Sequence, residues 1–185
     1  MEKLLKTFED LKQKNLSIDL TRGKPHSDQL DLSNDLMTQA VDPIGENGVD
    51  LRNYGEPIGI IEARRLGADI LDSRVDLTIA GEQSSYLLMT QLLLGRSLFG
   101  LEDDPWKDDK EPAFLCAVPG FDRHFATLEG LGLKMHTVNL CSSGIDLDDL
   151  NKKLSKYPNI KGLICVPRHS NPSGEVFSDE NITNL

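Results

Sequence analysis

Residues 113–140, AFLCAVPGFDRHFATLEGLGLKMHTVNL, decide the fold of this chain. They begin with an unbroken apolar run, 113–118, which has the length of a strand buried on both faces. A helix-length segment at 122–131 ends at Gly132, and residues 135–140 again suit a strand. A strand, a helix and a second strand in this order predict two parallel strands joined by a right-handed crossover.

The same alternation continues on both sides of this stretch. From the apolar pattern of each segment, the sequence predicts strands at 77–80 and 160–166 and helices at 58–71, 84–98 and 146–156. The expected fold class is therefore α/β, with helices flanking a mostly parallel sheet of about four strands.

The N-terminal part of the sequence has a different character. Apolar residues recur there at helical spacing, at Leu4, Leu5, Phe8 and Leu11. This spacing predicts an amphipathic helix over roughly the first fourteen residues. The residues that follow are polar and punctuated by proline and glycine, and such a long aperiodic segment usually carries function or wraps around another body. We expect two parts, an N-terminal helix with an extended arm at 1–53 and an α/β domain at 54–185.

The composition narrows the classes of partner. Acidic residues outnumber basic ones by 30 to 20, and the formal charge of −10 would repel nucleic acids and anionic membranes. No apolar run reaches the length of a signal peptide or a membrane span. The three cysteines form no CxxC pair and predict reduced thiols in a cytoplasmic protein, and the four histidines show no metal-ligand spacing. We expect no nucleic-acid or membrane partner and no bound metal.

Candidate site residues follow the ends of the predicted strands, because parallel sheets bind ligands beyond the carboxyl ends of their strands. Gln83, Ser84 and Ser85 stand where the strand expected at 77–80 gives way to a helix. Free amides and small hydroxyl groups at a helix start can cradle a phosphate. The simpler alternative is that Ser84 only caps the helix.

Two further candidates follow later strands. Phe121 comes just after a Pro-Gly turn, where its ring could lie on a flat cofactor, although a core phenylalanine after an ordinary turn is the simpler interpretation. Asn171 is held extended by Pro172, and Gly174 permits a turn, so the Asn171 amide is presented at the sheet edge.

Three segments together resemble a known family. The class I/II aminotransferases, which are pyridoxal-phosphate enzymes of fold type I, carry an Asn-Pro-Thr/Ser-Gly motif that resembles Asn171-Pro172-Ser173-Gly174. Their tyrosine-containing motif resembles Arg52-Asn53-Tyr54-Gly55, and their N-terminal substrate-loop signature resembles Leu20-Thr21-Arg22-Gly23-Lys24-Pro25. The sequences of these segments are most similar to those of a bacterial aspartate aminotransferase subgroup. The segments also occur in the same order as in the family.

The resemblance implies a fold and a cofactor. The fold would be the three-layer large domain of fold type I, incomplete in this chain, and the cofactor would be pyridoxal 5′-phosphate. Gln83, Ser84 and Ser85 would hold the cofactor phosphate. Phe121 would stack on the pyridine ring, and Asn171 would donate a hydrogen bond to the phenolic oxygen of that ring.

The resemblance also implies roles away from the ring. His124 would lie behind the ring in a supporting position, and the Gly23 amide would lie near the substrate carboxylate. Tyr54 would reach the phosphate of the neighbouring subunit, so the site would be shared across a homodimer. The reaction implied is the transfer of an amino group between an amino acid of the aspartate type and a 2-oxo acid.

The family's cofactor-binding lysine lies well downstream of the Asn171 motif, beyond Leu185, so no catalytic residue is assigned. We expect a truncated aminotransferase that is inactive and marginally stable alone, with weak or absent binding of pyridoxal phosphate. One alternative is a non-catalytic module that binds a phosphate or complements a partner chain. Another is a different fold-type-I chemistry, such as a lyase, or a regulator with an aminotransferase-like domain.

Overall fold

The chain divides into two units. The first comprises Met1–Glu56 and Ile60–Glu62. The second comprises Pro57–Gly59 and Ala63–Leu185 and contains the sheet. The computed structural model describes all residues except 1, 19–20, 22 and 102–103.

The first unit holds short helical segments. The helix expected at the start of the chain is confirmed as α1 (Glu2–Gln13), and the four apolar side chains on its predicted face are all exposed in this chain. Within the arm, the structure adds two short helical segments, α2 (Ser27–Asp31) and the 3-10 helix η1 (Asn34–Thr38).

The start of α2 explains why the sequence pattern does not indicate this helix. His26 Nδ1 accepts the Asp28 N–H at 3.3 Å, and Gln29 Oε1 accepts the His26 N–H at 2.8 Å. These two bonds form a capping box and satisfy amides that a helix start leaves unpaired. Histidine is not one of the usual capping residues, so the helix start carries no familiar signal.

The second unit is built on a four-stranded sheet in the order β3-β2-β1-β4. The strands are β1 (Ala113–Val118), β2 (Lys134–Cys141), β3 (Gly144–Ile145) and β4 (Ile160–Ile164). β1 pairs in parallel with both β2 and β4, and β3 is antiparallel to β2. The mostly parallel α/β sheet is thereby confirmed, with strands where they are expected at 113–118, 135–140 and 160–166. β3 is an additional strand, too short to show a periodic pattern.

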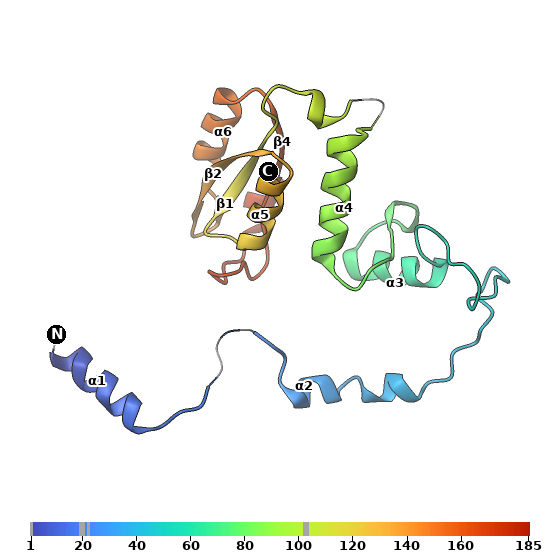
Figure 1. Ribbon diagram of the computed structural model, residues 1–185, viewed down its shortest axis with the longest axis horizontal. Coiled ribbons are helices and arrows are strands. Elements are labelled where there is room, and N and C mark those ends of the chain that lie inside the picture. The colour runs from blue at the N-terminus through green and yellow to red at the C-terminus, as the bar shows by residue number, and fades with distance from the viewer. Residues whose placement is uncertain (1, 19–20, 22, 102–103) are drawn as a thin grey trace. The chain divides into compact units, whose positions relative to one another are not determined.

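Helices cover both faces of this sheet, which makes three layers (Figure 1). α4 (Ser85–Leu98) and α5 (Asp122–Gly130) pack on one face, and α6 (Leu147–Lys156) packs on the other. Side chains of β1 alternate between the faces and contribute to two separate cores. The core beneath α4 and α5 contains Leu93, Trp106, Phe114, Cys116, Leu128 and Leu133, and the core beneath α6 contains Leu115, Ala117, Val138, Ile145, Leu150 and Phe177.

Trp106 joins the end of α4 to the central strand. It opens the 3-10 helix η3 (Trp106–Asp108) and is 7% exposed. Its ring meets the Phe114 ring edge-on, with centroids 5.5 Å apart, and the Arg96 guanidinium lies 5.2 Å from the Trp106 centroid. The ring pair and the cation–π contact together hold α4 against β1.

The remaining predicted helices are also present. Those expected at 58–71, 84–98, 122–131 and 146–156 are confirmed as α3 (Ile61–Leu71), α4, α5 and α6. A last short helix, α7 (Asp179–Thr183), is capped by Ser178, whose Oγ accepts the Asn181 N–H at 3.1 Å. Within the described ranges, no helix is both long and apolar enough to cross a bilayer.

The strand expected at 77–80 is wrong. The segment begins inside the 3-10 helix η2 (Val75–Leu77), and its later residues belong to no strand of the described sheet. The Arg64 guanidinium donates to the carbonyl oxygens of Thr78 at 2.9 Å and Val75 at 2.7 Å. A side chain thereby satisfies these two acceptors in place of a neighbouring strand.

The cysteines differ in their expected reactivity. Burial raises the pKa of Cys116 to about 11, whereas hydrogen bonds with Ser143 lower the pKa of the exposed Cys141. Because the thiolate is the nucleophile, we expect iodoacetamide at pH 8 to modify Cys141 at least ~10-fold faster than Cys116. Peptide mapping by mass spectrometry after timed labelling measures both rates, with Cys141→Ser as the control. Equal rates in the folded chain would contradict this prediction.

Candidate functional site

The first turn of α4 is suited to an anion. Among the described α-helices, α4 alone has no acidic residue in its first turn. Ser84 is the N-cap, and its Oγ accepts the Leu87 N–H at 3.4 Å. The expectation that Ser84 caps the helix is therefore confirmed. The side chains of Gln83 and Ser85 have no hydrogen-bond partner in the described part of the chain. The positive end of the helix dipole and these free donors favour the binding of a phosphate.

Phe121 stands at the start of α5, directly after the end of β1. Gly120 makes this turn possible, because a Cβ there would lie 2.7 Å from both the Ala117 carbonyl oxygen and Phe125 Cζ. The Phe121 side chain is half-buried and belongs to neither apolar core. Its ring meets the His124 ring edge-on, with centroids 5.2 Å apart. Part of the Phe121 side chain therefore remains accessible to a ligand.

Tyr86 connects the start of α4 to this aromatic pair, and the sequence pattern did not single it out. The Tyr86 and His124 ring centroids are 6.3 Å apart. The Tyr86 hydroxyl also shares a hydrogen bond of 2.7 Å with Thr127 Oγ1, one turn further along α5. A tyrosine directly after Ser85, at the ligand end of a leucine-rich helix, is the signal that could have identified it.

Asn171 lies in the loop 167–177, which follows β4 and is called the Asn171 loop below. The Ser170 N–H donates to the Glu175 carbonyl oxygen at 3.0 Å, and the Gly174 N–H donates to the Ser170 carbonyl oxygen at 2.5 Å. Gly174 has φ of +76°, as a glycine in a tight turn permits. The exposed Asn171 amide has no hydrogen-bond partner among the described residues, and the following peptide bond to Pro172 is cis. The amide is free to bind a ligand.

Two of the predicted residues of the second unit, Phe121 and His124, lie together at one end of the sheet. Phe121, His124 and the buried Ser170 line a common hollow, so the residue before Asn171 lies against the aromatic pair. The hollow measures about 10 Å³, whereas small-molecule pockets hold roughly 300–1,000 Å³. The hollow is therefore too small to enclose a cofactor.

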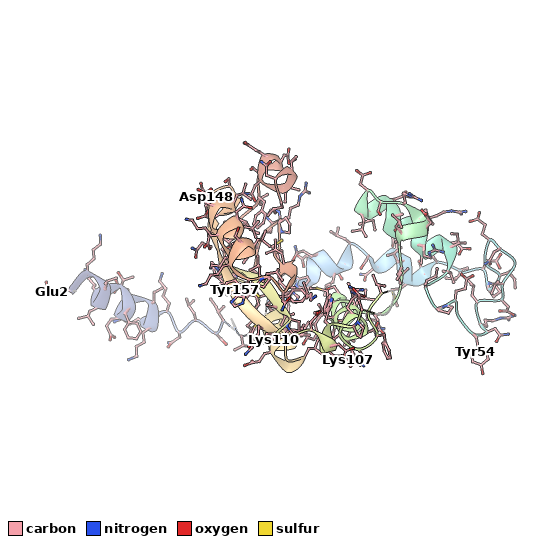
Figure 2. The ribbon with its side chains drawn as sticks, turned by 90° about the horizontal axis from the view of Figure 1, so that it is seen from above. Glu2, Tyr54, Lys107, Lys110, Asp148 and Tyr157 are labelled. Atoms are coloured by element: carbon pink, nitrogen blue, oxygen red, sulfur yellow. The ribbon has the colours of Figure 1, made fainter. Side chains whose placement is uncertain are left out.

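A larger hollow lies at the opposite end of the strands. It measures about 510 Å³ and contains none of the predicted site residues. His136 and Tyr157 stack there with centroids 3.5 Å apart, and Lys110 lines the same hollow. Tyr157 and Lys110 are labelled in Figure 2. Burial, and then the charges of nearby lysines, lower the pKa of His136. We do not assign the cofactor here, since parallel sheets bind ligands at the carboxyl ends of their strands.

Two predicted residues belong to the first unit. Tyr54 is 95% exposed (Figure 2), and a Cβ added at Gly23 would meet no atom within 4 Å. Leu20 and Arg22, which complete the motif around Gly23, lie outside the described residues. The roles of Tyr54 and Gly23 stay predictions.

Comparison with known proteins identifies the relatives of the chain. The sequence profile of the aspartate amino-transferase family matches residues 1–185. An aspartate aminotransferase of Corynebacterium glutamicum is 38% identical over 185 residues, which cover 97% of this chain and 42% of the relative. The crystal structure of a Corynebacterium diphtheriae protein assigned as an aminotransferase has a TM-score of 0.88 at 40% identity, covering 100% of this chain and 46% of that one.

A more distant structure shares the fold alone. It is the alpha-aminoadipate aminotransferase of Thermus thermophilus in complex with N-(5′-phosphopyridoxyl)-L-leucine, with a TM-score of 0.58 and 19% identity. The similarity covers 72% of this chain and 31% of that one. The chain spans less than half the length of each of these relatives.

Proposed function

Because the chain belongs to the aspartate amino-transferase family, we propose that it forms the front portion of an enzyme that transfers amino groups between aspartate-type amino acids and 2-oxo acids, with pyridoxal 5′-phosphate as cofactor. The observation that carries the proposal is the meeting of three features at one end of the sheet. These are the acid-free start of α4, the aromatic pair Phe121–His124, and the Asn171 loop.

The residues present fit the phosphate and one face of the ring. The side chains of Gln83 and Ser85 and the amides at the very start of α4 could donate to a phosphate, while Ser84 caps the same turn by accepting the Leu87 N–H. The accessible part of the Phe121 ring could stack on a pyridine ring, while the His124 ring contacts Phe121 edge-on. When bound, pyridoxal phosphate supplies an electron sink for negative charge at the substrate Cα.

In this proposal, Asn171 stabilises the negative charge of the cofactor ring. Its free side-chain N–H would donate to the phenolic oxygen, which stabilises negative charge on that oxygen. The amide is neutral and cannot itself move a proton at neutral pH. The lysine that the chemistry requires would come from sequence that the 185 residues do not contain.

The first unit completes the proposal. Residues 1–53 would act as a dimer-contact arm and residues 54–185 as part of the cofactor-binding domain. Tyr54 would reach the phosphate bound by the second subunit of a homodimer, and the Gly23 amide would bind a substrate carboxylate. The three cysteines are free thiols, which supports a reducing, cytoplasmic location.

A second candidate is a non-catalytic module that binds a phosphate or complements another chain. The small size of the hollow beside Phe121, about 10 Å³, favours this candidate, since the rest of a ligand site would have to come from another chain or from further sequence. The two candidates differ in whether amino transfer follows cofactor binding.

The test uses the complete polypeptide, read from the coding DNA past Leu185, with the 185-residue chain as matched control. We expect the complete polypeptide to show cofactor absorbance and to transfer amino groups from aspartate to 2-oxoglutarate. The control should be no faster than free pyridoxal phosphate. Cofactor absorbance without amino transfer would favour the non-catalytic module, as would a stop codon after Leu185 with co-purification of a complementary chain. A complete polypeptide that neither binds the cofactor nor transfers amino groups overturns the proposal.

Asn171→Ala is expected to weaken pyridoxal phosphate binding by the complete polypeptide about 10-fold, the value of one hydrogen bond to a charged acceptor. The exposed Ser173, in the same loop, provides the control variant Ser173→Ala, which should bind as the wild type does. Equilibrium dialysis measures both affinities. Equal affinity in the Asn171 variant and the wild type removes Asn171 from the site.

A further inference from the structure

A buried asparagine fastens the segment that carries Asn171 to the edge of the sheet. Asn181 lies in α7, and only 5% of its surface is exposed. Its side-chain oxygen accepts the Ile145 N–H at 3.0 Å, and its side-chain N–H donates to the Ile145 carbonyl oxygen at 2.8 Å. The amide therefore satisfies both backbone groups of one β3 residue, as a neighbouring strand would.

Water cannot easily replace this side chain. β3 is the outermost strand on its side of the sheet, yet Ile145 is only 1% exposed. If the Asn181 amide were removed, a buried N–H and a buried carbonyl oxygen would both lose their partner, which destabilises the local structure. The position thus accepts few other residues.

The Asn171 loop returns to the sheet just before Asn181. The Phe177 N–H donates to the Pro167 carbonyl oxygen at 2.8 Å, and the Ser178 N–H donates to the Ser143 carbonyl oxygen at 2.8 Å. Phe177 itself is buried in the core beneath α6. The outgoing end of the loop is held by β4, and the returning end is held by the turn before β3 and by Asn181.

Gly144 makes this attachment possible from the other side. Its φ is +134°, and a Cβ there would overlap Asn181 Oδ1 and lie 2.9 Å from Phe177 Cγ. A side chain at this position would displace both residues. Gly144 therefore provides a second, independent way to disturb the attachment.

We propose that Asn181 is a positioning residue. It holds the returning end of the Asn171 loop, so that the Asn171 amide stays beside Phe121 and His124 in the proposed cofactor site. The proposal rests on the function proposed above for Asn171. Asn181 acts through the loop, because its own side chain is occupied by Ile145.

Amide hydrogen exchange tests the attachment without the cofactor. In Asn181→Ala we expect the amides of Ser170, Phe177 and Ser178 to exchange at least ~10-fold faster, while the amides of β1 keep their rates. The matched control is Asn151→Ala, an exposed asparagine on α6, which should leave both groups unchanged. Gly144→Ala should accelerate the same three amides.

A second readout connects the attachment to the cofactor. In the complete polypeptide, Asn181→Ala should weaken pyridoxal phosphate binding about 3- to 10-fold, because a loop that samples more conformations presents Asn171 for less of the time. Asn171→Ala should weaken binding without changing the exchange of the three amides. If the wild type binds no pyridoxal phosphate, the proposed function fails, while the exchange data still decide whether Asn181 holds the loop.

If Asn181→Ala unfolds the whole domain, the β1 amides also exchange freely, and this variant is then replaced. Asn181→Asp then takes its place, since it keeps the size of the side chain and the acceptor for the Ile145 N–H. Faster loop exchange with unchanged β1 exchange in this variant supports the proposal. Unchanged loop exchange in both Asn181→Asp and Gly144→Ala overturns it.

Discussion

Leu115→Ala is expected to lower the free energy of unfolding by about 3–4 kcal/mol, the usual cost of removing a leucine side chain from a packed core. Leu115 is 1% exposed and lies in the middle of β1, the strand that pairs with neighbours on both sides. The cavity would open between the sheet and α6, where backbone hydrogen bonds limit relaxation. A small domain has only about 5–15 kcal/mol of stability, so the loss is a large part of the total.

Urea denaturation followed by circular dichroism measures this effect as a lower midpoint with an unchanged slope. The matched control is Leu154→Ala on α6, where the side chain is 46% exposed and the expected change is about 0.5 kcal/mol. If the two variants shift the midpoint equally, Leu115 does not lie in a packed core.

Phe121→Ala should weaken pyridoxal phosphate binding by the complete polypeptide about 30- to 100-fold. The alanine loses both the stacking energy and the apolar area of the ring, together worth about 2–3 kcal/mol. The effect on folding should be small, because Phe121 is half-buried and belongs to neither core. Absorbance titration with the cofactor measures the binding constant.

Phe121→Trp is the matched control. Tryptophan keeps a flat ring for stacking, so its affinity should stay within about threefold of the wild type. If Phe121→Ala bound pyridoxal phosphate as tightly as the wild type, Phe121 would not stack on the cofactor. A loss of similar size in both variants would indicate that the shape of the α5 start matters more than the ring.

The central strands were predictable from the sequence because burial on both faces produces continuous apolar runs. Residues 113–118 illustrate this, since Phe114 and Leu115 are buried in opposite cores. The segment at 77–80 has a similar apolar character, but the Arg64 guanidinium, from 14 positions earlier, donates to the Thr78 carbonyl oxygen. Such a side-chain bond leaves no periodic trace in the sequence.

The candidate site was predictable only in part. The Gln83–Ser85 segment and Phe121 stand at element boundaries, which the apolar pattern locates to within a few residues. The contact between Tyr86 and His124 joins two helices and is a tertiary feature. The same holds for Asn181, whose partner Ile145 is 36 positions away.

The single tryptophan of this chain provides a built-in reporter. Trp106 packs against Phe114 beneath α4, in the core on one face of the sheet, whereas Leu115 faces the other. Its fluorescence follows the detachment of α4 from the sheet, because water would then reach the indole and move the emission to longer wavelengths. Comparing this signal with circular dichroism in the Leu115→Ala variant would reveal whether the two faces melt together or one after the other.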